Sequence, residues 1–161
     1  MALIVTPVPA SQTGLTPTGS SAEGYTLHED SPEGQIDIGM SVLDFSLGPV
    51  WEEQEEWVDL DTMLRRAAQV RAYGSLGFAK LILEAQKEGR NIIPRELRKP
   101  GVVILLPRTT FQNKVGKRGV ACLDAGGGPS VREGMWGVYF SWWGRYTNPF
   151  QRGALFVRPR E

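Results

Sequence analysis

The chain has 161 residues, enough for one domain of ordinary size, and it contains 18 basic and 18 acidic residues, so its formal net charge is zero. Its single cysteine, Cys122, excludes an intrachain disulfide and any metal site built from several cysteines. No apolar run reaches the roughly 18 residues of a membrane span, and the first residues lack the features of a secretory signal. We therefore expect a protein that is cytoplasmic when it is made, and a virus or phage particle is a further expected location.

The neutral total conceals two oppositely charged parts. Residues 1–64 contain twelve acidic residues and no Lys or Arg, whereas residues 65–161 contain all eighteen basic residues and six acidic ones. The two parts therefore carry formal charges of −12 and +12. Such asymmetry is typical of segments that interact with a partner of opposite charge, and here each part is a candidate partner for the other.

Residues 1–40 are predicted to form a long extended acidic arm. Four prolines and five glycines interrupt every helical pattern in this range. A segment of this composition buries too little apolar surface to offset the entropy lost on ordering, so we expect its own body, a neighbouring subunit or another partner to hold it. Leu3, Ile4 and Val5 are expected to form a short strand that pairs with the edge of a neighbour's sheet.

Residues 41–58 form an acidic transition segment, in which Trp51 and Trp57 flank four glutamates. A charge run of this kind is most often a solvated loop, which the two aromatic side chains would anchor here. The alternative is that the glutamates are a ligand for a basic groove.

Residues 59–161 are expected to form a basic body that begins with two consecutive helices. Apolar residues recur at helical spacing after Asp59 and Asp61, either of which can cap a helix, and again after Ser75, with Gly74 between the two runs. Four β-rich segments follow, at residues 102–106, 119–124, 134–146 and 153–159. The predicted class is therefore α+β, with two helices packed on a small antiparallel sheet or a partly open barrel.

The stretch richest in aromatic residues spans residues 135–150 and contains seven of them. Strand alternation assigns Trp136 and its neighbours to a core-facing side and leaves Tyr139, Trp143 and Arg145 on the other side. Exposed aromatic rings beside an arginine are typical of a protein interface and equally of a surface that stacks on single-stranded nucleic acid. Cover by the helices or by the arm is the third alternative.

Catalysis finds no support in the motifs. Asp124 precedes three glycines that could cradle a phosphate, but no Gly-Lys-Ser/Thr follows them. Aspartic protease chemistry would need a second carboxylate from a symmetric dimer, and the only histidine, His28, would have to fold onto Cys122 to form a nucleophile pair. We expect no enzyme activity and no catalytic, metal or cofactor site; an enzyme that uses Asp124 is the weakest hypothesis.

The charges rank two further hypotheses. If the basic body bound nucleic acid, the acidic first part of the chain, with its charge of −12, would compete with the nucleic acid for that body. A subunit of an oligomer instead gains electrostatic steering and strand pairing from such an arm. The leading hypothesis is a non-enzymatic structural subunit of a homo-oligomer or larger assembly, for example in a virus or phage particle, whose arm docks on its own or a neighbour's body. The alternative is a nucleic-acid-binding module with an autoinhibitory acidic arm. The predicted interface residues are Leu3, Ile4, Val5, Trp51, Trp57, Tyr139, Trp143 and Arg145, and the predicted nucleic-acid contacts are Lys114, Lys117, Arg118, Tyr139, Trp143 and Arg145.

Overall fold

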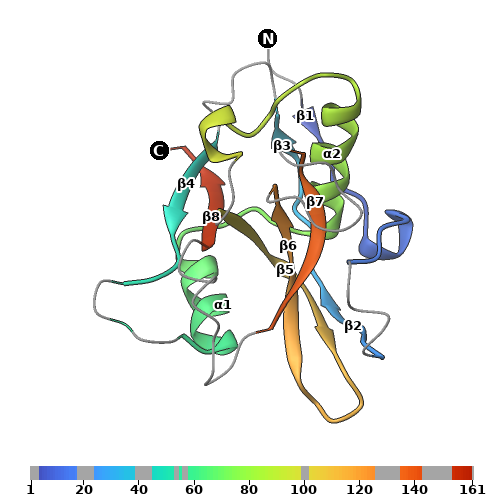
Figure 1. Cartoon of the computed structure of the whole chain (residues 1–161), viewed down its shortest axis with the longest axis vertical. Helices are drawn as coiled ribbons and strands as arrows, with labels where there is room; N and C mark the ends of the chain where they lie inside the picture. The colour runs from blue at the N-terminus through green and yellow to red at the C-terminus, as the bar shows by residue number, and fades with distance from the viewer. Residues whose placement is uncertain are drawn as a thin grey trace.

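The structure is a computed structural model in which two helices accompany a mainly antiparallel sheet. It describes residues 4–17, 24–38, 45–52, 55, 58–98, 102–125, 135–142 and 154–160. In chain order the elements are β1 (Ile4–Val5), η1 (Ala10–Gln12), β2 (Thr26–Asp30), β3 (Ile36–Asp37), β4 (Phe45–Pro49), α1 (Leu60–Gln69), α2 (Leu76–Lys87), η4 (Arg95–Leu97), β5 (Val103–Gln112), β6 (Arg118–Asp124), β7 (Gly137–Trp142) and β8 (Ala154–Pro159) (Figure 1). The predicted α+β class is confirmed, and the division of the chain at residues 40 and 58 stays a prediction.

Both helices begin at the residues that the sequence favours. The Asp59 carboxylate accepts a hydrogen bond from the Thr62 backbone N–H at 2.7 Å, and the Ser75 hydroxyl accepts one from the Phe78 N–H at 3.1 Å. Each cap supplies an acceptor for an N–H group that has no partner within its helix. The longer helix, α2, has 12 residues, and none of the helices in the described ranges is long and apolar enough to cross a membrane.

The main sheet is organised around β5. Its strand order is β4-β8-β5-β6-β7, and β2 pairs with β5 as well. β6 runs along one side of β5, while the other side is shared: β8 pairs in parallel with residues 103–104, and β2 pairs antiparallel with residues 109–112. A register shift between Leu106 and Thr110 lies between these two stretches. The shared edge of β5 therefore has a gap between β8 and β2.

The connection between the helices passes through this gap. Tyr73 donates its N–H to the Val157 carbonyl of β8 at 2.6 Å, and Gly74 accepts from the Arg108 N–H of β5 at 2.7 Å. Gly74 has a φ of +152°, and a β-carbon there would lie 2.8 Å from the Pro107 side chain. Only glycine meets both the backbone angle and the space, because any side chain would collide with β5.

The two helices pack on opposite faces of the sheet, because side chains along each strand alternate between faces. Ile104 and Leu106 of β5 are buried in a core with α2, which we call the α2-side core, whereas Leu105 between them is buried in a core with α1, the α1-side core. β6 repeats the pattern, with Leu123 in the first core and Cys122 in the second. Each face of the sheet is thus covered by one helix.

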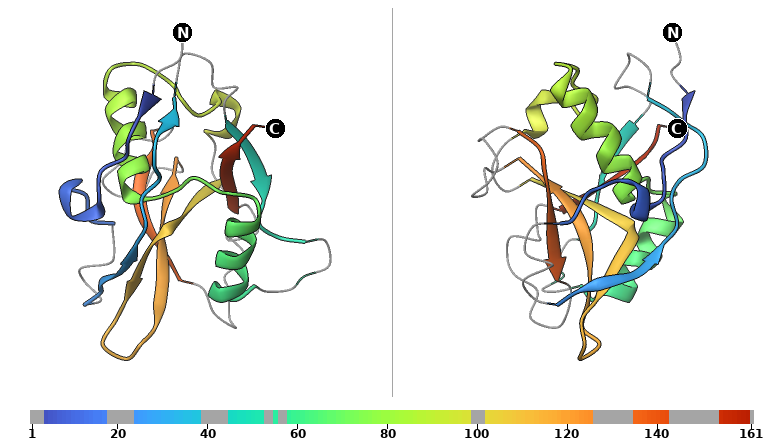
Figure 2. Two further views of the ribbon diagram at one scale, coloured as in Figure 1. Left: turned by 180° about the vertical axis from the view of Figure 1, so that it is seen from behind. Right: turned by 90° about the vertical axis from the view of Figure 1, so that its right-hand side faces the viewer.

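The described parts of the first forty residues lie against the body of the same chain. β1 pairs with β3, with Ile4 opposite Asp37 and Val5 opposite Ile36, and β2 pairs with β5. Ala10 and Ile36 are buried in the α2-side core. Figure 2 shows β1 and β3 running side by side next to α2.

Candidate functional site

The predicted interface residues do not meet at one place in the part of the chain that the structure describes. Ile4 is 56% exposed, and Val5 is partly buried against the α2-side core. Trp51 and Tyr139 are both partly buried against the α1-side core. Leu3, Trp57, Trp143 and Arg145 lie outside the described residues, so their part in an interface stays a prediction.

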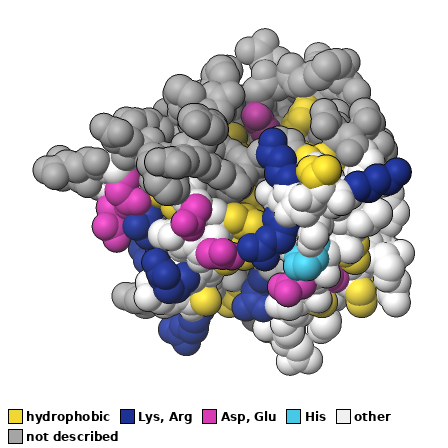
Figure 3. All heavy atoms as spheres, turned by 90° about the horizontal axis from the view of Figure 1, so that it is seen from below, with side chains coloured by type: hydrophobic (Ala, Val, Ile, Leu, Met, Phe, Trp, Pro, Cys, Tyr) yellow, Lys and Arg dark blue, Asp and Glu magenta, His cyan; other side chains and the backbone are white. Residues whose placement is uncertain are grey.

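Three of the six predicted nucleic-acid contacts, Lys114, Lys117 and Arg118, lie on the hairpin of β5 and β6. Lys114 and Lys117 are exposed in the turn between β5 and β6, beside Val115, which is 86% exposed. Arg118 instead pairs with Asp61 of α1 at 2.7 Å, so its charge is already partly neutralised. On the face shown in Figure 3, Lys and Arg side chains are interleaved with Asp and Glu around the chain's single histidine, and they do not form one basic patch.

Part of the acidic transition segment is paired with α1. The Arg66 guanidinium lies 2.8 Å from Glu55 Oε1 and 3.6 Å from Glu52 Oε1, and it donates to the Val50 carbonyl at 3.1 Å. Glu55 is partly covered in this arrangement, while Glu52 remains exposed. This pairing is intermediate between the two sequence-based alternatives, because a single arginine, and no basic groove, receives these two glutamates.

Two carboxylates of the N-terminal segment, residues 1–40, are bound by N–H and hydroxyl groups, and no lysine or arginine side chain of the described residues pairs with them. Glu33 is only 3% exposed; it accepts from the Gly74 N–H and from the Ser75 hydroxyl, the latter at 2.6 Å. Asp30 accepts from the Thr109 hydroxyl at 2.6 Å and from the Ala10 N–H at 2.8 Å. Glu33 thereby lies at the N-terminal end of α2, where the helix dipole favours a negative charge.

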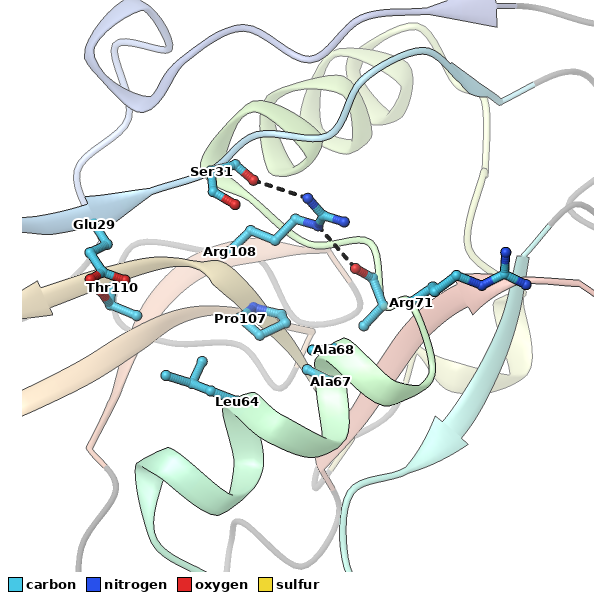
Figure 4. A pocket seen from close by; sticks show the side chains of 10 residues that line it. Glu29, Ser31, Leu64, Ala67, Ala68, Arg71, Pro107, Arg108 and Thr110 are labelled. Atoms are coloured by element: carbon cyan, nitrogen blue, oxygen red, sulfur yellow. Dashed lines mark hydrogen bonds between the residues drawn. The ribbon is translucent and has the colours of Figure 1, made fainter.

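A cleft lies beside the gap in the sheet edge. It has a volume of about 370 Å³ and lies between the C-terminal half of α1, the bend of β5 and the strand β2 (Figure 4). Its floor is apolar and made of small side chains, and its polar groups come from all three elements. The lining residues are Glu29, Ser31, Leu64, Ala67, Ala68, Arg71, Ala72, Pro107, Arg108 and Thr110.

Arg108 is fixed at this cleft by the backbone. Its Nε donates to the Ala72 carbonyl at 3.1 Å and its Nη1 donates to the Ser31 carbonyl at 3.2 Å, as the dashed lines in Figure 4 show. The guanidinium carries five N–H donors, so these two bonds hold the group in place and leave other donors unused.

Arg71 adopts an unusual backbone conformation at the end of α1. Its N–H donates to the Ala68 carbonyl at 3.1 Å, and the following N–H, of Ala72, donates to Ala67 at 2.9 Å. This is the Schellman ending, in which glycine is the usual residue at the left-handed position. Arg71 occupies that position with a φ of +51°, at a cost of about 1 kcal/mol relative to glycine. Its exposed guanidinium extends along the rim, away from Pro107 and Leu64 (Figure 4).

Thr110 is a buried polar residue in the lining of the cleft. It is 3% exposed, and its hydroxyl has no hydrogen-bond partner among the described residues.

Cys122 lies in the α1-side core, where burial, assisted by the charge of Asp124, raises its pKa to about 12. A thiol with such a pKa is protonated and inert at neutral pH. No group of three or more His, Cys, Asp or Glu side chains suited to a metal occurs in the described ranges.

Sequence reasoning missed the cleft. Arg71, Arg108 and Thr110 belong to no motif, and 37 positions separate the first two in the sequence. One local signal was that the position after the first predicted helix is occupied by Arg71 and not by glycine. This signal is too weak to mark a site. Comparison of the chain with models of known protein families, with curated proteins and with solved structures found no match.

Proposed function

We propose that this chain is a non-enzymatic structural subunit of a homo-oligomer or larger assembly. The observation that supports the proposal best is β2: its residues 26–29 are all exposed, with Leu27 at 46%, and β5 is its sole partner among the described strands. An exposed edge strand presents unpaired backbone groups to a strand of another chain. A virus or phage particle is one setting in which such a subunit would work.

A second copy of the chain suits this edge. Two β2 strands paired antiparallel about a two-fold axis at His28 would place Leu27 of each copy opposite Glu29 of the other. No two carboxylates would then face each other directly, which avoids the like-charge repulsion that destabilises strand pairs. The register shift between Leu27 and Glu29 bends the strand, so the added pairing is expected to be short.

The N-terminal segment, residues 1–40, would contribute to assembly because it contains the edge strand β2. Because Glu33 binds a buried N–H and a buried hydroxyl of the body and Asp30 binds the Thr109 hydroxyl, docking of this segment on the body should resist salt better than exposed ion pairs do. Deletion of residues 1–40 would also remove Ile36 and Ile38 from the core, so a point substitution is the cleaner test of assembly.

The test is the molecular mass of the full chain in solution, measured by light scattering at low and high salt. We expect a multiple of 17.8 kDa and expect Leu27→Asp to shift the protein toward the monomer. Val115→Asp is the control, because it places the same charge at another exposed apolar residue, which lies in the turn between β5 and β6 and not on β2. A monomeric wild-type chain, or equal effects of both substitutions, would refute the proposal.

Nucleic-acid binding is a second candidate function, favoured by the exposed lysines Lys114 and Lys117 at the tip of the β5–β6 hairpin. Contacts to phosphates through these lysines would weaken steeply with salt. We expect the double substitution Lys114→Gln and Lys117→Gln to reduce binding of a labelled single-stranded RNA at low salt. Lys87→Gln, an exposed lysine at the end of α2, is the control; no binding by the wild type would eliminate this candidate.

A further inference from the structure

We infer that the cleft between α1, β5 and β2 binds a small anionic ligand that carries a phosphate or carboxylate group. The inference does not depend on the proposed assembly. The volume of about 370 Å³ falls within the usual range of small-molecule sites, roughly 300 to 1,000 Å³. Such sites combine an apolar surface with a few fixed polar groups, and this cleft has both.

The fixed polar group is Arg108. A guanidinium matches the two oxygens of a carboxylate or phosphate, and it binds them best when its position is set before the ligand arrives. The carbonyls of Ala72 and Ser31 set that position here. Because both of these acceptors are neutral, they orient the arginine without cancelling its charge.

Arg71 supplies a second positive charge at the rim. Its guanidinium makes no hydrogen bond or ion pair with the described residues, and its backbone has the left-handed conformation that glycine usually adopts. In Figure 4 the side chain extends away from the cleft centre. Exposed side chains change rotamer within nanoseconds, so the guanidinium can swing over the cleft when an anion occupies it.

Thr110 is the third contribution. A buried hydroxyl without a partner is costly and rare in folded proteins, and here it belongs to a residue of the cleft wall. The hydroxyl oxygen is closed to solvent in the free protein, so an anionic oxygen would give this hydroxyl its acceptor only after the Thr110 side chain turns toward the cleft. Leu64, Ala67 and Pro107 give the cleft apolar lining, and a lower local dielectric beside that lining would strengthen the interactions of the anion with the arginines.

The negative charge of Glu29 should repel an anion in the cleft. The inference therefore predicts opposite effects on anion binding for substitutions of Glu29 and of Arg71. Glu29 lies on β2 at the opposite end of the view from Arg71 (Figure 4), and the charged lining residues together carry one net positive charge. Removal of the Glu29 charge should tighten binding of an anion, whereas removal of the Arg71 charge should weaken it. Changes of opposite sign from two substitutions in one cleft are not expected from general destabilisation of the fold.

The experiment is a nuclear magnetic resonance titration of the full ¹⁵N-labelled chain with sodium phosphate and with sodium acetate at constant ionic strength. Saturable shifts are expected for the amides of Ala68, Arg71, Ala72, Arg108 and Thr110. The tighter of the two probes identifies the anionic group. Arg71→Gln should raise the dissociation constant about two- to fivefold, the range of an exposed charge pair, and Glu29→Gln should lower it by a similar factor.

Two further variants complete the test. Arg65→Gln removes the same charge from an exposed residue of α1 outside the cleft and should leave the dissociation constant unchanged. Thr110→Val removes only the hydroxyl, whose loss breaks no hydrogen bond in the free protein, and should weaken binding. The inference is overturned if sodium chloride alone reproduces the shifts, or if Arg65→Gln weakens binding as much as Arg71→Gln.

Discussion

Gly77 of α2 lies directly against the backbone of Val8. A β-carbon at Gly77 would overlap the Val8 carbonyl oxygen and would come within 2.9 Å of the Val8 nitrogen. The N-terminal segment therefore packs on the helix at a distance that only glycine permits, and this contact joins the two parts of opposite charge.

Gly77→Ala is expected to lower the free energy of unfolding by about 1 to 2 kcal/mol. The added methyl group must push the Val8 backbone away, at an overpacking cost of about 1 to 3 kcal/mol, and the better helix propensity of alanine returns up to about 1 kcal/mol. Urea denaturation measures the difference. Gly34→Ala is the control, because nothing lies within 4 Å of its added β-carbon; equal stabilities of the two variants would contradict the prediction.

Glu33→Ala is expected to destabilise the protein by about 2 to 3 kcal/mol, because it leaves the buried Gly74 N–H and Ser75 hydroxyl without their acceptor. Glu29→Ala, which removes an exposed carboxylate of the same segment, should change stability by less than about 0.5 kcal/mol. Thermal unfolding of both variants compares them directly. A similar melting temperature for the two would show that Glu33 does not hold the segment on α2.

Arg66→Gln should cost about 1 to 2 kcal/mol, since it breaks the ion pair with Glu55 and the bond to the Val50 carbonyl. Arg65→Gln removes a neighbouring exposed arginine and should be close to neutral. The difference between the two variants should shrink as salt rises, because screening weakens the ion pair in the wild type. A salt-independent difference would assign the effect to the carbonyl bond alone.

The stabilisation of α1 by its Asp59 cap should depend on pH. Hydrogen bonding from Thr62, with a smaller effect of Arg65 and Arg66, holds the pKa of Asp59 below its ordinary value of 3.8. The folded pKa is depressed, so this stabilisation is present above pH 3.8 and is lost as the pH falls below it. Asp59→Asn keeps an acceptor without the titration, so its deficit relative to the wild type should shrink as the pH falls below 3.8.

Asp59→Ala removes the acceptor altogether and should cost about 1 kcal/mol at neutral pH. Urea unfolding at pH 7 and pH 3 measures both substitutions. A constant deficit of Asp59→Asn between these two pH values would show that the charge of Asp59 does not contribute.

Cys122 should resist alkylation in the folded protein. Burial raises its pKa to about 12, so almost no thiolate is present at pH 8, and the side chain is also closed to reagents. Iodoacetamide should modify the thiol only in denaturant. Rapid labelling without denaturant would show that the α1-side core opens.

Local patterns in the sequence determined much of the fold. Helical periodicity with Asp59 and Ser75 as caps located α1 and α2, and the β-rich segments 102–106 and 119–124 located the first part of β5 and most of β6. These predictions succeeded because capping, periodicity and β-propensity act within a few residues along the chain. The same applies to Gly74, where the break between the helices was visible in the sequence.

Only the tertiary structure decided where the helices lie and how the cleft is built. The passage of Gly74 between β8 and β2 puts α1 and α2 on opposite faces, and no local pattern encodes that path. The sequence showed that the first 64 residues are acidic, but only the structure showed that Asp30 and Glu33 bind N–H and hydroxyl groups. Arg71 and Arg108 line one cleft because a helix end and a bent strand converge, and such convergence depends on packing between segments that are distant in the sequence.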